Sequence, residues 1–187
     1  MSSYSRQQLE DWVKTIEVPA NSRVLDVGGS QLPVNSRLKN IGKDCEFKIL
    51  DLEQPHECKL QPDIIEDLNE IQYAHDSTFD YAFCLEVSEY WYDPIRALSN
   101  ICGYLKPSGI LYISFHFIYP VHNPVEQDYL RYTEIGAKKL LENAGFIIEE
   151  VKPRVLKTYI ANIDGMRPAK QYDKHDWSGC LIKAKKV

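Results

Sequence analysis

The chain has 187 residues, a length that suits a single domain with one hydrophobic core. Hydrophobic residues make up 44% of it and charged residues 26%, a composition that excludes a largely disordered chain. The formal net charge of -5 gives the chain no overall basic character, so we expect neither a nucleic acid nor an anionic membrane surface as its partner.

Five cysteines are scattered along the chain, and no two have the C-x-x-C spacing of a zinc knuckle. Their odd number is also unlike the paired framework of a small secreted protein. The beginning of the chain lacks the basic-then-apolar profile of a signal peptide, and the longest apolar run, residues 110–121, is too short to span a bilayer. We therefore expect a cytoplasmic protein without a membrane anchor, folded as one domain over residues 1–187.

In the first half of the chain, one predicted helix precedes four short predicted strands. Apolar residues spaced three and four apart indicate a helix that begins at Ser5, has Gln8 as its capping-box partner and ends before Pro19. Short apolar runs bounded by turn residues and acids indicate buried strands. These strands are expected at residues 23–27, 47–50, 62–67 and 80–85, with a short helix across 34–41.

The second half continues the alternation of helices and strands. Asp93 followed by Pro94 indicates a helix start, because aspartate caps helices and proline fits their first turn. Thr133 indicates the start of another helix, and Gly145 suits the left-handed cap at its end. Further strands are expected at residues 110–115, 147–151 and 180–184, with an irregular stretch between the last two.

This order of elements predicts an α/β fold. Strands that alternate with helices imply right-handed crossovers, and hence a mainly parallel sheet covered by helices on both faces. We therefore expect a Rossmann-like, doubly wound sheet of seven strands. Ligands of such sheets bind outside the carboxyl ends of the strands, so the residues that follow each strand are the candidates for function.

A tight glycine turn follows the first predicted strand, in the segment VLDVGGSQLP. Gly28 and Gly29 let a ligand approach the backbone closely. The dinucleotide fingerprint requires further glycines where this chain has Ser30 and Pro33, so a nucleotide-dependent oxidoreductase is disfavoured. Taken alone, the turn is as consistent with a plain connection as with a ligand site.

Carboxylates follow the second and third predicted strands. Asp51 and Glu53 come at the end of the second strand, and Asp67 comes at the end of the third. A carboxylate in the first of these places can accept hydrogen bonds from both ribose hydroxyls of an adenosine, and one in the second can face an exocyclic amine. Each acid alone is typical of a solvated loop, but their common position favours a nucleoside site.

At this point the chain resembles the class I S-adenosylmethionine-dependent methyltransferases, in particular the small type 11 domains, over about residues 23–146. The resemblance depends on blocks that occur in order: RVLDVGGS, KILDLE, PDIIEDLNE, FDYAFCLEVSEYWYDP, LKPSGILYIS and DYLRYTEIGAKKLLENAGF. The chain departs from the family where Ser30 and Leu32 replace glycines and where Tyr90 follows Glu89 in place of a histidine.

The resemblance implies S-adenosylmethionine as the cofactor. The glycine turn would contact its methionine part, Asp51 would bind the ribose with Glu53 as the fallback, and Asp67 would bind the adenine amine. The residues that the resemblance assigns to the cofactor are Asp26, Gly28, Gly29, Ser30, Asp51, Leu52, Asp67, Leu68, Cys84, Leu85 and Glu86.

The loop after the fifth main strand, residues 116–132, is the expected location of the methyl acceptor. His122 is the candidate general base, although a solvated loop histidine is the simpler interpretation. Tyr90, Tyr129 and Arg131 are the candidate acceptor contacts, and a pair between Arg131 and Asp128 is the structural alternative. The remaining loop histidines are far apart in sequence and predict no metal site; they are His56, His75 and His175.

The sequence thus favours methyl transfer from S-adenosylmethionine to a small molecule or a saccharide, with an oxygen acceptor slightly preferred. The alternative is a domain that binds the cofactor, catalyses weakly and acts through a partner protein. The short segment before the first strand leaves little room for a substrate lid, so a homodimer or a partner subunit could complete the site.

Overall fold

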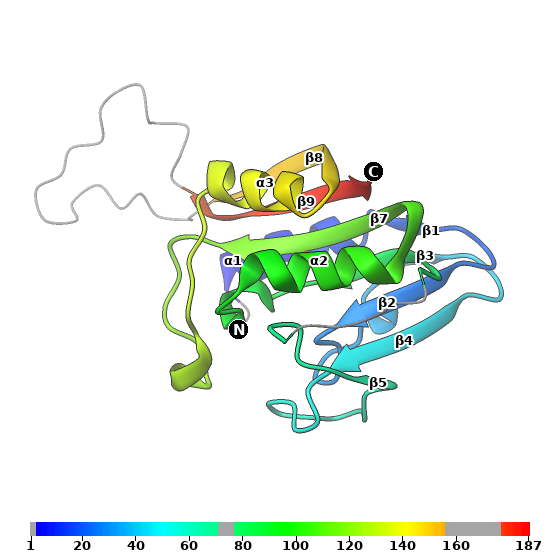
Figure 1. Ribbon diagram of the computed structural model, residues 1–187, viewed down its shortest axis with the longest axis horizontal. Coiled ribbons are helices and arrows are strands. Elements are labelled where there is room, and N and C mark those ends of the chain that lie inside the picture. The colour runs from blue at the N-terminus through cyan, green and yellow to red at the C-terminus, as the bar shows by residue number, and fades with distance from the viewer. Residues whose placement is uncertain (1–2, 71–76, 156–176) are drawn as a thin grey trace, which may run out of the picture.

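The computed structural model describes residues 3–70, 77–155 and 177–187 (Figure 1). The helical elements in these ranges are α1 (Tyr4–Val13), η1 (Val34–Ser36), η2 (Ser88–Tyr90), α2 (Pro94–Tyr104), η3 (Val125–Gln127) and α3 (Glu134–Asn143), of which the η elements are 3-10 helices. The strands are β1 (Glu17–Val18), β2 (Arg23–Val27), β3 (Asn40–Ile41), β4 (Glu46–Asp51), β5 (Ile64–Ile65), β6 (Phe79–Cys84), β7 (Leu105–His116), β8 (Phe146–Val155) and β9 (Trp177–Lys186).

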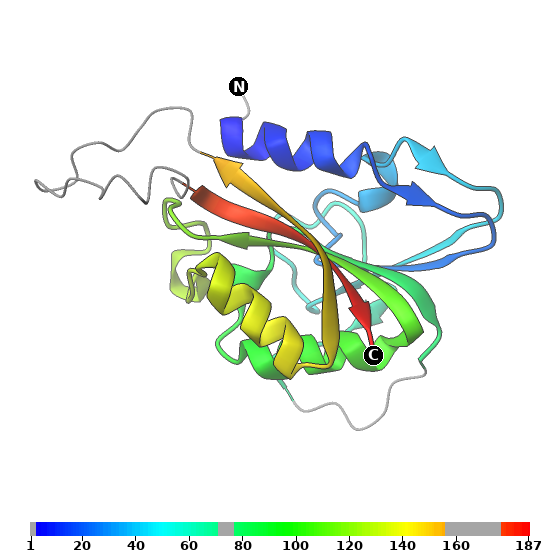
Figure 2. The same cartoon turned by 90° about the horizontal axis from the view of Figure 1, so that it is seen from above.

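Seven of these strands form the central sheet in the order β5-β4-β2-β6-β7-β9-β8. The first five run parallel, and β9 lies antiparallel between β7 and β8. Helix α1 covers one face of the sheet, and α2 and α3 cover the other (Figure 2). The predicted doubly wound, mainly parallel α/β fold is therefore confirmed. The short parallel pair β1-β3 forms a separate sheet that the sequence did not indicate.

Strand β7 is buried on both faces and joins the two apolar layers. Leu111 and Ile113 are fully buried on the side of α2 and α3, where they belong to the same cluster as Leu98 and Leu141. Tyr112 points to the opposite side, because successive side chains of a strand alternate between the faces. A strand that is buried on both faces has few polar positions, and this is why the sequence of β7 contains the continuous apolar run from which the strand was predicted.

On the other face, aromatic side chains hold α1 against the sheet. Trp12 of α1 meets Tyr112 edge to face, with ring centroids 5.6 Å apart. Tyr112 in turn stacks on Phe83 of β6, with a centroid distance of 5.1 Å. Burial of such rings is among the largest apolar contributions that a helix of ten residues can make.

The starts of α2 and α3 confirm their predicted caps. The Asp93 side chain accepts a hydrogen bond from the Arg96 backbone amide at 3.1 Å, and Thr133 Oγ1 accepts one from the Gly136 amide at 3.1 Å. Gly145, just past α3, has a φ of +91°, a conformation that side-chain-bearing residues rarely adopt. Local chemistry is thus sufficient to place these two helices.

The predicted start of α1 is wrong by two residues. The hydroxyl of Ser3, not that of Ser5, caps the helix. Ser5 lies within the first turn and is buried, with its Oγ 3.0 Å from Ser178 Oγ of β9. Gln8 is no capping-box partner either: its side chain exchanges two hydrogen bonds, of 2.9 and 3.0 Å, with the backbone of Val155 in β8. The side chains of Ser5 and Gln8 therefore form hydrogen bonds with distant parts of the chain and do not cap the helix.

Several strand limits differ from the prediction. β8 and β9 extend beyond their apolar centres, because antiparallel pairing continues through polar residues that the hydrophobic pattern does not mark. β7 begins earlier than expected, at Leu105, which pairs with Phe79 of the parallel strand β6. β5 is reduced to Ile64–Ile65, and the expected helix over residues 34–41 is replaced by η1 and β3. Most of the predicted irregular stretch lies outside the described residues. Among the described helices, none has both the length and the apolar character needed to cross a membrane.

The cap of α2 gives a stability prediction. We expect Asp93→Ala to lower the free energy of unfolding by about 1 kcal/mol, because an orphan amide at the helix start loses its acceptor. Denaturant unfolding followed by far-UV circular dichroism measures this. Asp11→Ala is the matched control, since the exposed Asp11 forms an ion pair with Lys14 on the surface of α1 and such pairs contribute about 0–1 kcal/mol. Equal losses in both variants would contradict the capping role.

Candidate functional site

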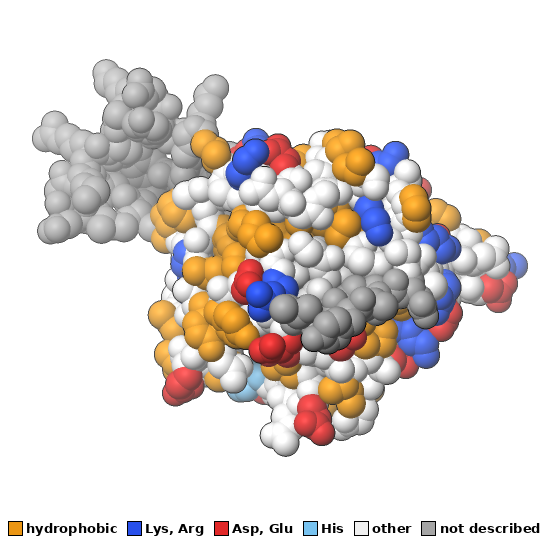
Figure 3. Space-filling model, viewed as in Figure 1, with side chains coloured by type: hydrophobic (Ala, Val, Ile, Leu, Met, Phe, Trp, Pro, Cys, Tyr) orange, Lys and Arg blue, Asp and Glu red, His pale blue; other side chains and the backbone are white. Residues whose placement is uncertain are grey.

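A cavity of about 270 Å³ lies at the carboxyl ends of β2, β4, β5 and β6. Its walls come from the ends of these strands, from η2 and from the loop around η3. This volume is close to the lower limit of small-molecule sites, which is roughly 300 Å³. On the face of the molecule in Figure 3, acidic, basic and hydrophobic side chains are interspersed. The adjacent strand ends on which the nucleoside hypothesis depends do meet at one cavity.

The glycine turn forms one wall of this cavity. Gly28 has a φ of +72°, and its amide donates to the Leu50 carbonyl at 2.8 Å. A Cβ at position 28 would lie 2.4 Å from Val87 Cγ2, and one at position 29 would lie 2.4 Å from Asp26 Oδ2. Both glycines are therefore required by close contacts, Gly28 at the cavity and Gly29 beneath it.

Asp26 holds the turn from below and does not line the cavity. Its side chain is buried, and Oδ2 accepts a hydrogen bond from the Val34 amide at 2.6 Å. Burial raises the pKa of Asp26 to about 7, although the Val34 amide and the nearby Arg37 act in the opposite direction. The carboxyl group thus ties β2 to η1.

Asp51 ends β4 and lines the cavity. Its carboxylate accepts hydrogen bonds from the Leu52 amide at 2.9 Å and from the Ser30 amide at 3.2 Å. An ionised carboxylate has about four acceptor positions, so these two described donors leave room for two further hydroxyl donors. Glu53, the fallback for the ribose, is exposed and is not part of the cavity wall.

Asp67 and Leu68 follow β5 and form another part of the wall. Asp67 Oδ1 accepts hydrogen bonds from the Asn69 backbone amide at 2.9 Å and from its side-chain amide at 3.0 Å. Asn69 Oδ1 accepts in turn from the backbone amides of Tyr92 and Asp93, at 2.9 and 3.2 Å. Asn69 therefore links the end of β5 to the start of α2.

The structure brings eight of the predicted site residues to the cavity: Gly28, Asp51, Leu52, Asp67, Leu68, Glu86, Tyr90 and Tyr129. The others lie behind the wall or in the adjacent loop: Asp26, Gly29, Ser30, Cys84, Leu85, His122 and Arg131. Sequence reasoning assigned no role to several lining residues: Gln31, His56, Asn69, Val87, Pro124 and Gln127. Asn69 had a sequence signal, because asparagine two residues after an aspartate is typical of a turn. The remaining five had none that we recognise.

A buried ion-pair network lies against the cavity at Glu86. Glu86 has a φ of +63°, and its carboxylate contacts Arg154 Nη1 of β8 at 2.6 Å and Ser114 Oγ of β7 at 3.0 Å. Burial alone would raise the pKa of Glu86, but His116 and Arg154 outweigh it and hold the pKa well below its usual range. Glu86 therefore carries its negative charge at neutral pH.

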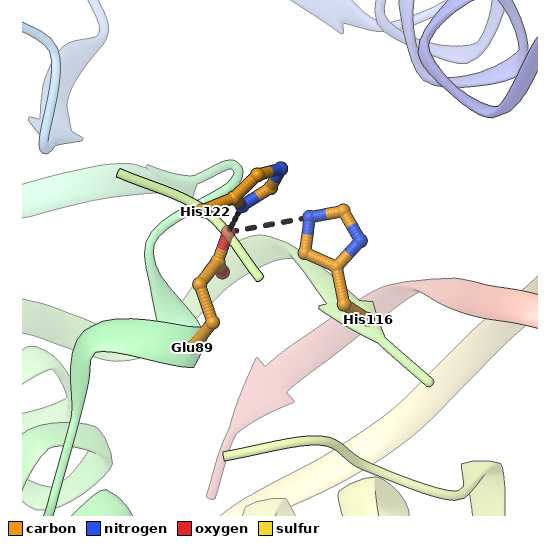
Figure 4. A group of neighbouring side chains, drawn as sticks. All are labelled: Glu89, His116 and His122. Carbon is orange, nitrogen blue, oxygen red and sulfur yellow. Dashed lines mark hydrogen bonds and ion pairs between the residues drawn. The ribbon is translucent and has the colours of Figure 1, made fainter. Parts of the chain in front are cut away.

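Glu89 and His116 continue this network and are both fully buried (Figure 4). Glu89 Oε1 lies 3.2 Å from His116 Nε2 and 3.0 Å from His122 Nδ1. Burial acts to lower the pKa of His116, but the carboxylates of Glu86 and Glu89 outweigh it and raise the pKa to about 9. Burial acts to raise the pKa of Glu89, but His116 and His122 outweigh it and lower the pKa. The carboxylates of the partly buried Glu86 and the buried Glu89 thus lie against the positively charged Arg154 and His116.

The loop after β7 is organised by Asp128. Its carboxylate accepts from the His122 backbone amide at 2.6 Å and forms a two-pronged pair with Arg131. Arg131 also donates to the carbonyls of Tyr119 and Pro120. The structure therefore contains the pair between Arg131 and Asp128, which was the structural alternative for Arg131. The Arg131 guanidinium fixes the loop that carries His122.

Aromatic side chains form the wall on the side of this loop. Tyr90, Trp91, Tyr92 and Tyr129 all line the cavity. The rings of Tyr92 and Tyr129 meet at 87° with centroids 5.9 Å apart. The Tyr90 hydroxyl donates to the Asn123 carbonyl at 2.9 Å. Burial, with a contribution from Glu89, raises the pKa of Tyr90, so its phenol stays protonated.

Comparison with known proteins bears on the family and the fold of the chain. A family model described as a methyltransferase domain, of type 11, matches residues 34–113. The match begins just after the glycine turn, the region where the chain departs from the family pattern, and ends within β7. It confirms the resemblance to class I, type 11 methyltransferase domains. The curated proteins compared with this chain include no match.

Solved structures of methyltransferases share the fold at low sequence identity. An S-adenosylmethionine-dependent methyltransferase from Mesorhizobium loti is 19% identical, with a TM-score of 0.60 over 97% of this chain and 98% of its own. The 1,6-didemethyltoxoflavin-N1-methyltransferase of Burkholderia thailandensis, solved with its substrate and S-adenosylhomocysteine, is 17% identical, with a TM-score of 0.59 over 98% of this chain and 76% of its own.

A third similar structure comes from an assembly. It is a chain from the complex that contains the Trm112 methyltransferase activator of Haloferax volcanii, and it is 17% identical. Its TM-score is 0.62 over 98% of this chain and 89% of its own. The family model supports the resemblance from which S-adenosylmethionine is expected, and the solved structures support the fold.

The buried Asp26 predicts a pH dependence of stability. With a pKa of about 7 in the fold and 3.8 as its ordinary value, Asp26 binds a proton in the folded protein over a pH range where the unfolded chain has lost it. Its contribution to the free energy of unfolding therefore falls as the pH rises from about 4 to about 7, by at most about 1.4 kcal/mol per pH unit.

Asp26→Asn removes this titration and keeps an acceptor for the Val34 amide. We expect the free energy of unfolding of the variant, measured relative to the unaltered protein, to increase over that pH range and then to level off. Parallel denaturant titrations at several pH values measure the difference. A difference that does not change with pH would show that Asp26 is already ionised in the fold at low pH.

Proposed function

We propose that this protein is an S-adenosylmethionine-dependent methyltransferase that acts on a small molecule or a saccharide, with an oxygen atom as the slightly preferred acceptor. The observation that carries the proposal is the cavity at the ends of β2, β4 and β5, where Asp51 presents a carboxylate beside the backbone of Gly28. The cytoplasm stays our expected location for this activity.

The residues at the cavity fit the adenosine part of the cofactor. Asp51 would accept hydrogen bonds from the ribose hydroxyls, since two of its acceptor positions are available beside the Leu52 and Ser30 amides. Asp67 and the buried Leu68 would flank the adenine. The methionine part would lie along the backbone of the glycine turn at the end of β2, where Gly28 adopts a φ of +72°.

The cofactor, when bound, supplies a methyl group on a sulfonium that an acceptor displaces in line. The protein's main task is then to hold the acceptor in position, which can lower a barrier by roughly 7–11 kcal/mol in favourable cases. The walls formed by η2 and by the loop around η3 surround the place where an acceptor would lie. They would also limit the access of water.

The aromatic wall supports a flat or sugar-like acceptor. Tyr92 and Tyr129, both exposed, offer ring surfaces of the kind on which sugars and planar molecules stack, and the buried Trp91 lies beside them in the wall. Tyr90 stays protonated and can only donate or position, so it does not replace a base. We propose Tyr90 and Tyr129 as acceptor contacts. Arg131 would act indirectly, by holding the loop through Asp128.

His122 stays our proposed base for an acceptor that must lose a proton. Its Nδ1 is bound to the buried Glu89, an arrangement that orients the ring and leaves Nε2 for a second partner. The His122 side chain is 26% exposed, and its neighbours along the loop include the cavity residue Pro124. An acceptor that extends from the cavity toward this loop would reach it.

A cofactor-binding domain that acts through a partner is the second candidate. The tyrosine that follows Glu89 favours it, because Tyr90 cannot supply the acid–base chemistry of a histidine. Calorimetric titration with S-adenosylhomocysteine tests both candidates. Detectable binding supports both of them, and no binding at millimolar ligand rejects both. A screen of hydroxylated acceptors for methyl transfer then separates them, because only the enzyme gives a methylated product without a partner.

The ribose assignment predicts the effect of removing Asp51. We expect Asp51→Ala to weaken the binding of S-adenosylhomocysteine by about 1–3 kcal/mol, the cost of losing charge-assisted hydrogen bonds. Isothermal calorimetry measures this. Glu53→Ala is the matched control and should leave the affinity unchanged, since Glu53 lies outside the cavity wall. The reverse result would assign the ribose to Glu53.

The acceptor side predicts a separate effect on turnover. His122→Ala should reduce kcat by about 10²-fold or more while the affinity for S-adenosylhomocysteine stays the same, because His122 lies outside the wall of the nucleoside cavity. Initial rates with any acceptor found in the screen provide kcat. An unaltered kcat would leave His122 with the structural role of a loop residue.

A further inference from the structure

Three side chains with metal-binding atoms converge beside the cavity from separate parts of the chain. Glu89 comes from η2, His116 from the end of β7 and His122 from the following loop, and their side chains point toward one another (Figure 4). One ligand atom from each lies within 4.8 Å of the other two. Sequence spacing did not indicate this group, because 27 residues separate Glu89 from His116.

The cluster has buried polar atoms without hydrogen bonds. Both ring nitrogens of His116 and Oε2 of Glu89 are buried and have no hydrogen-bond partner among the described residues. His116 Nε2 is close to the carboxylates of Glu89 and Glu86, at 3.2 and 3.3 Å, but at angles unsuited to hydrogen bonding. Buried polar atoms normally have a hydrogen-bond partner, and a bound metal ion would serve these atoms in that role, in place of the proton that His116 Nε2 otherwise carries between the two carboxylates.

We propose that Glu89, His116 and His122 bind a divalent first-row transition metal ion. Two imidazoles and one carboxylate suit ions such as Zn²⁺, Co²⁺ or Fe²⁺, whereas Mg²⁺ and Ca²⁺ prefer oxygen ligands. Three protein ligands leave at least one position on the ion for water or substrate.

The distances in the cluster are those of a metal site. Nitrogen and oxygen ligands bind these ions at about 2.0–2.2 Å, which places neighbouring ligand atoms roughly 3.0–3.4 Å apart. Glu89 Oε1 lies 3.0 Å from His122 Nδ1 and 3.2 Å from His116 Nε2. Only the spacing between the two imidazoles needs to adjust, by at most about 2 Å.

The surroundings contribute the charge and the rigidity that a metal site needs. Glu86 lies next to His116 and adds negative potential, while Arg154 fixes Glu86 from the opposite side. Asp128 holds the His122 backbone and thereby the loop. Such supporting contacts orient metal ligands and strengthen binding.

A metal ion here would change the role of His122. A histidine whose Nδ1 binds a cation no longer acts as a base, and an acceptor hydroxyl on the open position of the ion would lose its proton more readily. This consequence, unlike the metal site itself, depends on the proposed function. It assigns the acceptor as a molecule with a hydroxyl group.

Cobalt titration tests the site directly. We would treat the full, untagged chain with a chelator, desalt it and titrate Co²⁺ while recording visible absorption, which reports cobalt bound to nitrogen and oxygen ligands. We expect about one Co²⁺ per chain, displaced by Zn²⁺ but not by a large excess of Mg²⁺. Absence of saturable binding, or displacement by Mg²⁺, would overturn the proposal.

Variants locate the bound ion. His122→Ala and Glu89→Gln should each weaken Co²⁺ binding at least about tenfold, and the control His56→Ala, which alters an exposed histidine outside the cluster, should not. Circular dichroism verifies folding, and the partly exposed His122 provides the variant that disturbs the core least. Unchanged binding by both cluster variants would also refute the site. Titration of the same samples with S-adenosylhomocysteine keeps a failure of the metal site separate from a failure of the cofactor assignment.

Discussion

Neutralisation of the buried Glu89 and the partly buried Glu86 is the constraint on which the site depends. Glu86 and Glu89 follow β6, where the sheet is covered on both faces, and isolated carboxylates there would be very costly. Arg154 and His116 supply the compensating charges from β8 and β7. The wall of the cavity, the loop that follows β7 and the last part of the sheet are therefore held together by one set of ion pairs.

Much of the fold could be predicted from the sequence because its signals are local. The apolar runs predicted the seven strands of the sheet in order. Asp93 and Thr133 predicted the helices α2 and α3, whose first turns they cap. Asp51 and Asp67 could be placed at one edge because parallel strands bring their carboxyl ends together. The strength of these signals lies in hydrogen bonds and turns within a few residues.

The rest of the site could not be predicted because it depends on contacts between distant residues. Arg154 gives no hint in the sequence that it is buried against Glu86, 68 residues earlier. Ser5 looks like a helix cap until Ser178 is found beside it. Likewise, the sequence alone does not distinguish His116 and His122 from other histidines, because only the fold places Glu89 of η2 next to both of them. Tertiary packing decides which of several chemically similar residues takes part in the site.

The position of β9 has a consequence for the stability of the ion pairs. β9 is the last described strand along the chain but lies inside the sheet, between β7 and β8. In the described part of the sheet, β8 therefore has β9 as its neighbour and meets β7 only through it. Arg154 belongs to β8, so the guanidinium that neutralises Glu86 depends on β9 for its place in the sheet.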